Sequence, residues 1–200
     1  TVNDEVLKTI GRKHTAQQFF DAFELARKCG FDNINTDLIA GLPTDTPESF
    51  KNSLDSIVRL NAECITVHTL CMKRASRLTT EGVTLDLQQA RDAREMLAYT
   101  QNILGQNEYI PYYMYRQSRM VGNLENVGWS KRGFESLYNV YVMDETHTIL
   151  ACGSGGVTKL KRNNPDYLER IFNFKYPYEY IDRFDELIQR KSGIMQFYGQ

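Results

Sequence analysis

The hydrophobic positions in the N-terminal part of the chain follow two different periods. Apolar residues fall on one face at helical spacing over 16–28 and again over 47–60. Short runs rich in aliphatic and β-branched residues, 33–43 and 64–70, follow these helices and predict buried strands. The order helix, strand, helix, strand favours an α/β fold in which helices connect parallel strands.

Local signals mark the ends of the predicted helices. Thr15 is a residue type that caps a helix N-terminus, and Thr46 precedes Pro47, which is favoured in a first turn. Gly30 stands where a left-handed residue would end the first long helix. A further short helix is predicted over 4–10.

The character of the sequence changes after the second predicted strand. A polar connection over 71–83 leads to a long amphipathic helix, which Asp86 opens and Gly105 closes. The change in pattern predicts two parts, residues 1–80 and residues 81–200.

The C-terminal part has the pattern of mixed strand and helix. Residues 109–116 predict a strand, and 137–143 with 148–152 predict a hairpin. The Gly- and Asn-rich stretch 121–133 predicts irregular structure. The tail predicts a helix whose apolar face consists of Ile181, Phe184, Leu187 and Ile188.

One ionisable residue interrupts the apolar run at 33–43. Asp37 lies within this predicted strand, where a charge is costly unless it is paired. Polar residues towards the carboxyl ends of parallel strands commonly face a ligand crevice. The pattern leaves two interpretations open, a carboxylate that binds a cofactor and a structural cap for the turn at 41–45.

Charge and composition narrow the class of protein. The chain has 200 residues, 24 Lys and Arg against 25 Asp and Glu, and a formal net charge of −1. No run of like charge predicts nucleic-acid binding, and no segment predicts a membrane span or a signal peptide, so we expect a cytoplasmic protein. The four cysteines lack metal-binding spacing and predict free thiols. The chain starts at Thr1 in what reads as mid-domain, so we expect a fragment of a longer protein.

Several stretches together resemble one family. They are L-K-T-I-G-R-K-H-T at 7–15, N-I-N-T-D-L-I-A-G-L-P-T-D-T-P-E-S-F at 33–50, Y-Y-M-Y-R-Q at 112–117, G-N-L-E-N-V-G-W at 122–129, L-Y-N-V-Y at 137–141 and the turn G-S-G-G at 153–156. With these motifs the chain resembles the oxygen-independent coproporphyrinogen III oxidases, a branch of the radical S-adenosylmethionine (SAM) enzymes.

The resemblance implies a fold and a set of cofactor contacts. The fold is the C-terminal part of a partial TIM-like (β/α)6 radical SAM barrel, with SAM across the strand ends, followed by an α+β extension. Arg12 matches an arginine that contacts SAM, and Asp37 matches the carboxylate that reaches its ribose or methionine end. Cys71 matches a position whose backbone lies near the adenine, and Val157 matches an apolar contact from the extension. Guanidinium and carboxylate groups suit the carboxylate and hydroxyls of SAM.

The implied activity is oxidative decarboxylation of coproporphyrinogen III to protoporphyrinogen IX in haem biosynthesis, with SAM and a 4Fe–4S cluster as cofactors. The alternative is a haem-binding or haem-delivery protein of the same barrel family. The family holds its cluster with three closely spaced cysteines, and this sequence has no such motif. We therefore expect these residues alone to hold no metal and to be inactive. Exposed edges of an incomplete barrel would favour a dimer.

Other residues have two interpretations. The strand at 109–116 would either flank a tetrapyrrole or pack at a sheet edge, through Tyr113, Tyr115 and Arg116. The position of His68 within a strand predicts a core histidine more than a ligand, and His147 is predicted to be exposed in a turn.

Overall fold

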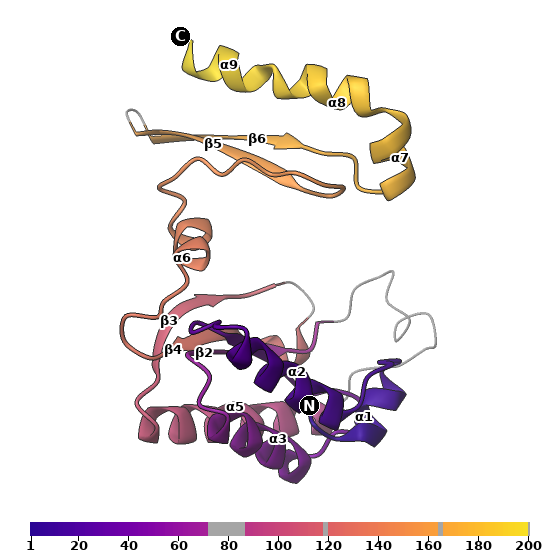
Figure 1. Cartoon of the computed structure of the whole chain (residues 1–200), viewed down its shortest axis with the longest axis vertical. Helices are drawn as coiled ribbons and strands as arrows, with labels where there is room; N and C mark the ends of the chain where they lie inside the picture. Colours follow the sequence, from indigo (N-terminus) through magenta and orange to yellow (C-terminus); the bar gives the residue numbers. More distant parts are fainter. Residues whose placement is uncertain (72–86, 118–119, 164–165, 200) are drawn as a thin grey trace. The chain divides into compact units, whose positions relative to one another are not determined.

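The structure is a computed structural model that describes residues 1–71, 87–117, 120–163 and 166–199 (Figure 1). Contacts within the chain divide it into two compact units, Thr1–Ser136 and Leu137–Gln200. The first unit contains a mixed sheet with helices on one face, and the second contains a hairpin with short helices.

The first unit is built around a four-stranded sheet in the order β1-β2-β4-β3. Strand β1 runs parallel to β2, whereas β4 is antiparallel to both of its neighbours. Among the described residues the sheet is open, and β1 forms one edge. The elements are α1 Asp4–Thr9, α2 Ala16–Lys28, β1 Asn35–Ala40, α3 Pro47–Arg59, β2 Cys64–Thr69, α5 Leu87–Gln106, β3 Ile110–Tyr115, η1 Val121–Asn123 and β4 Asn126–Ser130.

The helix starts follow the local signals in the sequence. Thr15 forms a capping box with Gln18, in which each side chain accepts a hydrogen bond from the backbone N–H of the other residue. The Thr46 hydroxyl accepts from the Ser49 N–H, and Pro47 occupies the first turn of α3. These caps fix where α2 and α3 begin.

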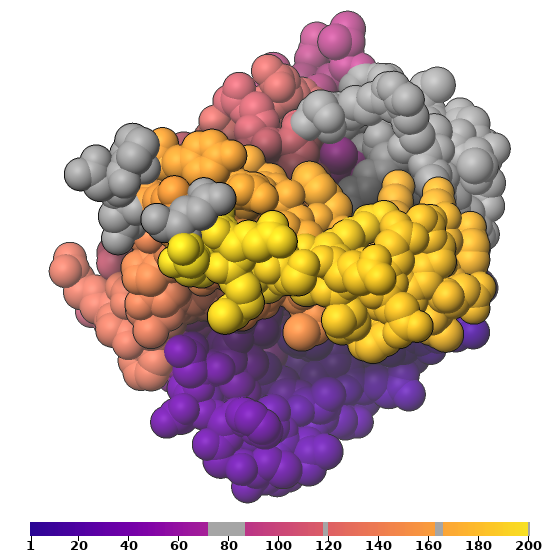
Figure 2. Space-filling view, turned by 90° about the horizontal axis from the view of Figure 1, so that it is seen from above, coloured from indigo at the N-terminus to yellow at the C-terminus, as the bar shows by residue number. Residues whose placement is uncertain are grey.

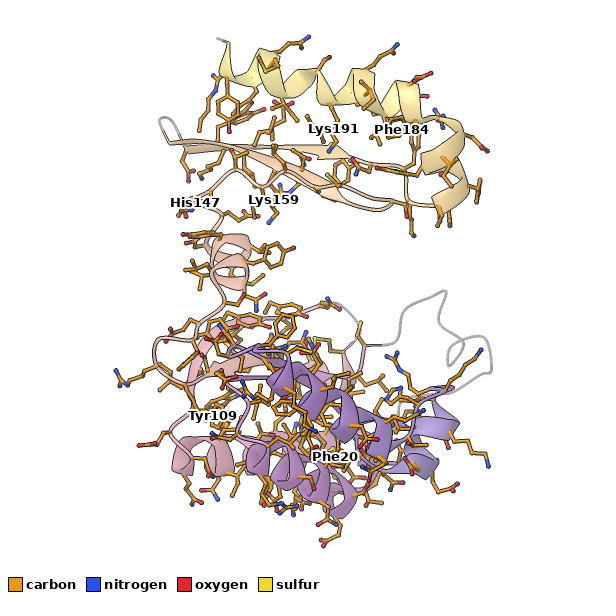
Figure 3. The ribbon with its side chains drawn as sticks, in the orientation of Figure 1. Phe20, Tyr109, His147, Lys159, Phe184 and Lys191 are labelled. Carbon is orange, nitrogen blue, oxygen red and sulfur yellow. The ribbon has the colours of Figure 1, made fainter. Side chains whose placement is uncertain are left out.

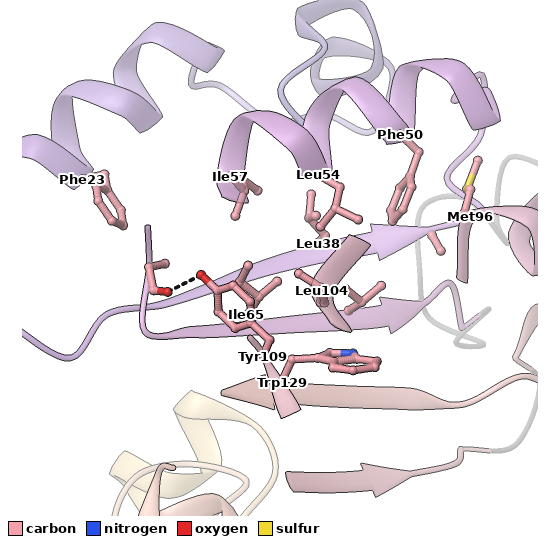
Figure 4. Close-up of a cluster of buried hydrophobic side chains, with 13 residues drawn as sticks. Phe23, Leu38, Phe50, Leu54, Ile57, Ile65, Met96, Leu104, Tyr109 and Trp129 are labelled. Atoms are coloured by element: carbon pink, nitrogen blue, oxygen red, sulfur yellow. Dashed lines mark hydrogen bonds between the residues drawn. The ribbon is translucent and has the colours of Figure 1, made fainter. Parts of the chain in front are cut away.

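The main core lies between one face of the sheet and the helices (Figure 4). Phe50, Leu54 and Ile57 of α3 pack with Leu38 of β1 in this buried cluster. The Tyr109 hydroxyl donates to the Ala62 carbonyl at 2.5 Å, and burial raises the pKa of Tyr109 to about 12. The covered face of the sheet thus serves stability.

The second unit consists of α6 Leu137–Asp144, β5 Val157–Asn163, β6 Asp166–Phe172, α7 Pro177–Asp182, α8 Phe184–Lys191 and α9 Gly193–Tyr198. Strands β5 and β6 form an antiparallel hairpin. The side chains of α8 and α9 form a continuous ridge in the space-filling view (Figure 2). Lys191 extends from α8 towards the hairpin (Figure 3) and donates to the Ala151 carbonyl and the Thr158 hydroxyl at 2.9 and 2.6 Å.

Most predicted elements before residue 117 are confirmed. The strands predicted at 33–43, 64–70 and 109–116 are β1, β2 and β3, and the long helix is α5. Asp86 and the predicted boundary between residues 80 and 81 lie outside the described residues. Strands β3 and β4 share a sheet with β1 and β2, and the first compact unit continues to Ser136. The predicted division into a barrel part and an extension stays a prediction.

Three predictions for the C-terminal part were wrong. Residues 137–143 form α6, although their aromatic and β-branched composition favours strand, because β propensity depends strongly on packing context. The partner segment 148–152 pairs instead with β5, through a bridge between Ile149 and Lys159. The stretch 121–133 contains the regular strand β4, in which glycine has a packing role described below.

Candidate functional site

The two faces of the four-stranded sheet differ in polarity. Along β1, Thr36, Leu38 and Ala40 are buried beneath the helices, whereas Asn35 and Asp37 are exposed on the other face. This alternation follows from the two-residue period of a strand. The face without helices is called the open face below, and it carries most of the candidate functional side chains.

Strand register places polar side chains in rows across the open face. Asp37 of β1 is level with Thr66 of β2, which is level with Gly128 of β4 and then Tyr113 of β3. The residues follow one another across all four strands, although they are distant in sequence. The sheet therefore brings residues from separate motifs into one row on the open face.

Asp37 is well placed to contact a ligand. Its carboxylate accepts a hydrogen bond from Asn35 Nδ2 at 2.8 Å, and His68 Nε2 lies 3.8 Å from the same oxygen. The side chain is 61% exposed. The His68 imidazole, followed by the Asn35 amide, lowers the pKa of Asp37 against the opposing effect of burial. Asp37 is therefore an ionised acceptor with room for a further partner.

His68 links Asp37 to the aromatic side of the open face. Its Nδ1 lies 3.3 Å from the Tyr115 hydroxyl, and its side chain is 28% exposed. The prediction of a core histidine is thus incorrect. Thr66 and His68 alternate with the core residues Ile65 and Val67 along β2, so their side chains face away from the helices. His147, in the second unit, is exposed as predicted.

Tyr113 reaches across β4 because the residue beneath it is glycine. A Cβ atom at Gly128 would overlap the Tyr113 ring. The ring therefore crosses the backbone of β4, and the Tyr113 hydroxyl lies 3.2 Å from Thr66 Oγ1. Tyr115 is parallel to Tyr113, with 6.3 Å between ring centroids and 6° between ring planes. Sequence reasoning missed Gly128 and Thr66, although a glycine inside an aromatic-rich strand segment is a usable signal.

A pocket of about 470 Å³ beside β1 brings two predicted site residues together. Arg12, Asp37 and His68 line it, with apolar side chains that include Ile39 and Leu42. Arg12 follows Gly11, whose φ of 75° lets the chain turn after α1. A guanidinium and a carboxylate in one partly apolar pocket suit a ligand that has a carboxylate, hydroxyl groups and an apolar part.

The other predicted contact residues lie elsewhere. Cys71 follows β2 and forms an antiparallel bridge with Met120. Val157 is the first residue of β5, in the second unit. Their roles as cofactor contacts stay predictions, as do those of Arg12 and Asp37.

Over 1–71, 87–117, 120–163 and 166–199, no three His, Cys, Asp or Glu side chains gather in a way that could hold a metal ion. Within the same ranges, no helix has the length and apolar character needed to span a membrane.

Known proteins share sequence and fold with this chain. The radical SAM superfamily pattern matches residues 1–57. The chain is 37% identical over 193 residues to the oxygen-independent coproporphyrinogen-III oxidase-like protein HemZ of Bacillus subtilis, covering 96% of this chain and 38% of that protein. It is 32% identical over 173 residues to the heme chaperone HemW of Lactococcus lactis, covering 82% of this chain and 41% of that protein.

The fold comparison agrees with the sequence comparisons. The coproporphyrinogen III oxidase HemN of Escherichia coli, a radical SAM enzyme, superposes with a TM-score of 0.64 over 92% of this chain and 41% of that one, at 19% identity. The chain thus spans about two-fifths of the length of these relatives. It belongs to the radical SAM superfamily and is related to the oxygen-independent coproporphyrinogen III oxidases.

Proposed function

We propose that the chain is part of an enzyme that oxidatively decarboxylates coproporphyrinogen III to protoporphyrinogen IX in haem biosynthesis by radical SAM chemistry. The observation that carries this proposal is that Arg12 and Asp37 line one pocket at β1. The similarity to the HemZ oxidase-like protein over 96% of the chain supports the same reaction class. In this proposal β1 and β2 are strands of a partial (β/α)6 barrel, and the C-terminal residues form its α+β extension.

The residues in the pocket suit SAM. Arg12 would pair with the carboxylate of its methionine part, and the ionised Asp37 would accept hydrogen bonds from the ribose hydroxyls. The backbone at Cys71 would lie near the adenine, and Val157 would add an apolar contact. In a full-length protein, bound SAM would supply the chemistry that removes hydrogen from a propionate side chain, before carbon dioxide is lost.

The 4Fe–4S cluster that radical SAM proteins generally use does not fit these residues. Cluster ligation needs three closely spaced thiolates, and the cysteines of this sequence, Cys29, Cys64, Cys71 and Cys152, do not supply that motif. Burial also raises the pKa of the Cys64 thiol, which disfavours its thiolate form. We propose that the 200 residues alone bind no cluster and do not turn over substrate.

A second candidate function is haem binding and delivery. The similarity to the heme chaperone HemW over 82% of the chain favours it. In that case the protein would bind haem without converting the porphyrinogen.

An anaerobic assay of a full-length protein that contains this sequence separates the two. With SAM, a reductant and coproporphyrinogen III, chromatography should detect protoporphyrinogen IX after oxidation to the porphyrin. The variant Asp37→Asn should lose most of this turnover. Tight haem binding without any product would reject the oxidase and support the delivery function.

A further inference from the structure

The open face contains a directed chain of hydrogen bonds that ends at Asp37. The Thr66 hydroxyl donates to Asn35 Oδ1 at 3.0 Å, and Asn35 Nδ2 donates to Asp37 at 2.8 Å. Because the single hydrogen of Thr66 is used in this way, the contact of 3.2 Å with Tyr113 is one in which Tyr113 donates. The Tyr113 hydroxyl hydrogen therefore points into the sheet.

A second row of side chains, Tyr115 and His68, leads towards the same carboxylate. When the His68 ring carries its hydrogen on Nε2, that hydrogen faces the Asp37 carboxylate 3.8 Å away, beyond hydrogen-bond distance. His68 Nδ1 is then an acceptor, and Tyr115 donates to it across 3.3 Å. The hydroxyl hydrogen of Tyr115 is then also used in a hydrogen bond within the protein.

The consequence is a pair of phenol oxygens whose hydrogens point to acceptors within the protein, so each would meet a ligand as an acceptor; the Tyr115 oxygen also interacts with the Asn126 side chain. Burial raises the pKa values of Tyr113 and Tyr115, which keeps both hydroxyls protonated. Their parallel rings, 6.3 Å apart, are positioned together because Gly128 leaves space for Tyr113. Such a pair recognises a ligand through its N–H groups.

Resting on the proposed function, we infer that Tyr113 and Tyr115 are substrate contacts that accept hydrogen bonds from the pyrrole N–H groups of a porphyrinogen. In a porphyrinogen every pyrrole keeps its N–H, and the flexible macrocycle can turn these groups to one side. The corresponding porphyrin has the same carboxylates, but its ring is planar and its remaining N–H groups lie inside the macrocycle. The contact therefore distinguishes the reduced ligand from its oxidised form.

The test compares two ligands on this 200-residue chain under anaerobic conditions. Equilibrium dialysis gives the affinities for coproporphyrinogen III and coproporphyrin III, and calorimetry gives the affinity for S-adenosylhomocysteine. Tyr113→Phe and Tyr115→Phe remove only the oxygen atoms. Tyr99→Phe is the matched control, because its hydroxyl donates to Asp55 in the helical layer.

Each single variant should weaken coproporphyrinogen III binding by about fivefold, the effect of one hydrogen bond, and change coproporphyrin III binding by less than about twofold. Gly128→Ala should reproduce the loss by displacing the Tyr113 ring. An equal loss for both tetrapyrroles, no loss for either, or no porphyrinogen binding by the unmodified chain would overturn the inference. If S-adenosylhomocysteine fails to bind while the ligand preference and its loss persist, the inference stands and the proposed SAM site fails.

Discussion

The two faces of the four-stranded sheet use the same strands for different purposes. The face under the helices is apolar and tightly covered, with Leu38 and Ile65 almost inaccessible to solvent. The open face carries a hydrogen-bonded network around Asp37, whose side chain remains mostly exposed. Stability and ligand binding should therefore respond to different substitutions, even when the two substituted residues are neighbours along one strand.

The largest expected effect comes from the covered face. Leu54→Ala should lower the free energy of unfolding by about 2–5 kcal/mol, because it removes a fully buried side chain and leaves a cavity. Urea denaturation followed by circular dichroism measures the loss. Ile39→Ala is the control on the other face, where the residue is only partly buried. Equal losses for the two variants would contradict the division of roles between the faces.

On the open face, Asp37→Asn should weaken ligand binding while leaving the stability of the fold nearly unchanged. It should weaken S-adenosylhomocysteine binding by about 10- to 100-fold, since a charged acceptor becomes a neutral amide. The free energy of unfolding should change by less than about 1 kcal/mol, because the side chain is largely exposed. Calorimetry and urea denaturation provide the two measurements. The control Asp21→Asn, on the exposed side of α2, should change neither; a large loss of stability in Asp37→Asn would reject its ligand-binding role.

The covered face was easier to predict from the sequence than the open one. Helical spacing of Phe50, Leu54 and Ile57 identifies the buried side of α3 directly, because burial repeats with the helix period. The row from Asp37 to Tyr113 depends on the order β1-β2-β4-β3, which no local pattern reveals. The motif resemblance nevertheless selected Asp37 as a cofactor contact, and the aromatic strand selected Tyr113 and Tyr115 under one of its two interpretations.

Composition is a poor guide to structure in segments where tertiary context decides between strand and helix. Residues 137–144 have the β-branched and aromatic residues of a strand but form α6, in which no residue is buried. The hairpin β5–β6 was missed because its strands are rich in charged residues, as solvent-facing strands often are.

Glu63 connects α2 to the start of β1 through hydrogen bonds whose contribution to stability should depend on pH. Burial favours the protonated carboxyl, but hydrogen bonds from Arg27 and the Ile34 N–H outweigh it and lower the pKa of Glu63. The carboxylate therefore contributes stability that is present above its ordinary pKa of 4.5 and lost as pH falls through the lower folded-state pKa. Glu63→Gln should cost about 1–2 kcal/mol at neutral pH.

Denaturation at several pH values measures this contribution. The difference in unfolding free energy between the unmodified chain and Glu63→Gln should shrink as the pH falls from about 5 to about 3. The control Glu95→Gln removes a more exposed ion pair with Lys51 and should have a much smaller effect. A difference that grows on acidification would show that the sign of the pKa shift is wrong.

The smallest expected effect isolates a single link of the open-face network. Thr66→Val keeps the shape of a buried side chain but removes the hydroxyl between Tyr113 and Asn35, so it should cost about 0.5–1.5 kcal/mol. A double-mutant cycle with Tyr113→Phe should give a coupling free energy of about 0.5 kcal/mol or more, because the two groups share one hydrogen bond. The same cycle with Tyr99→Phe should be additive, since Tyr99 bonds to Asp55 in the helical layer. Additive losses for Thr66→Val and Tyr113→Phe would mean that the two side chains act independently. The hydrogen bond that the Tyr113 hydroxyl donates to Thr66 would then be rejected.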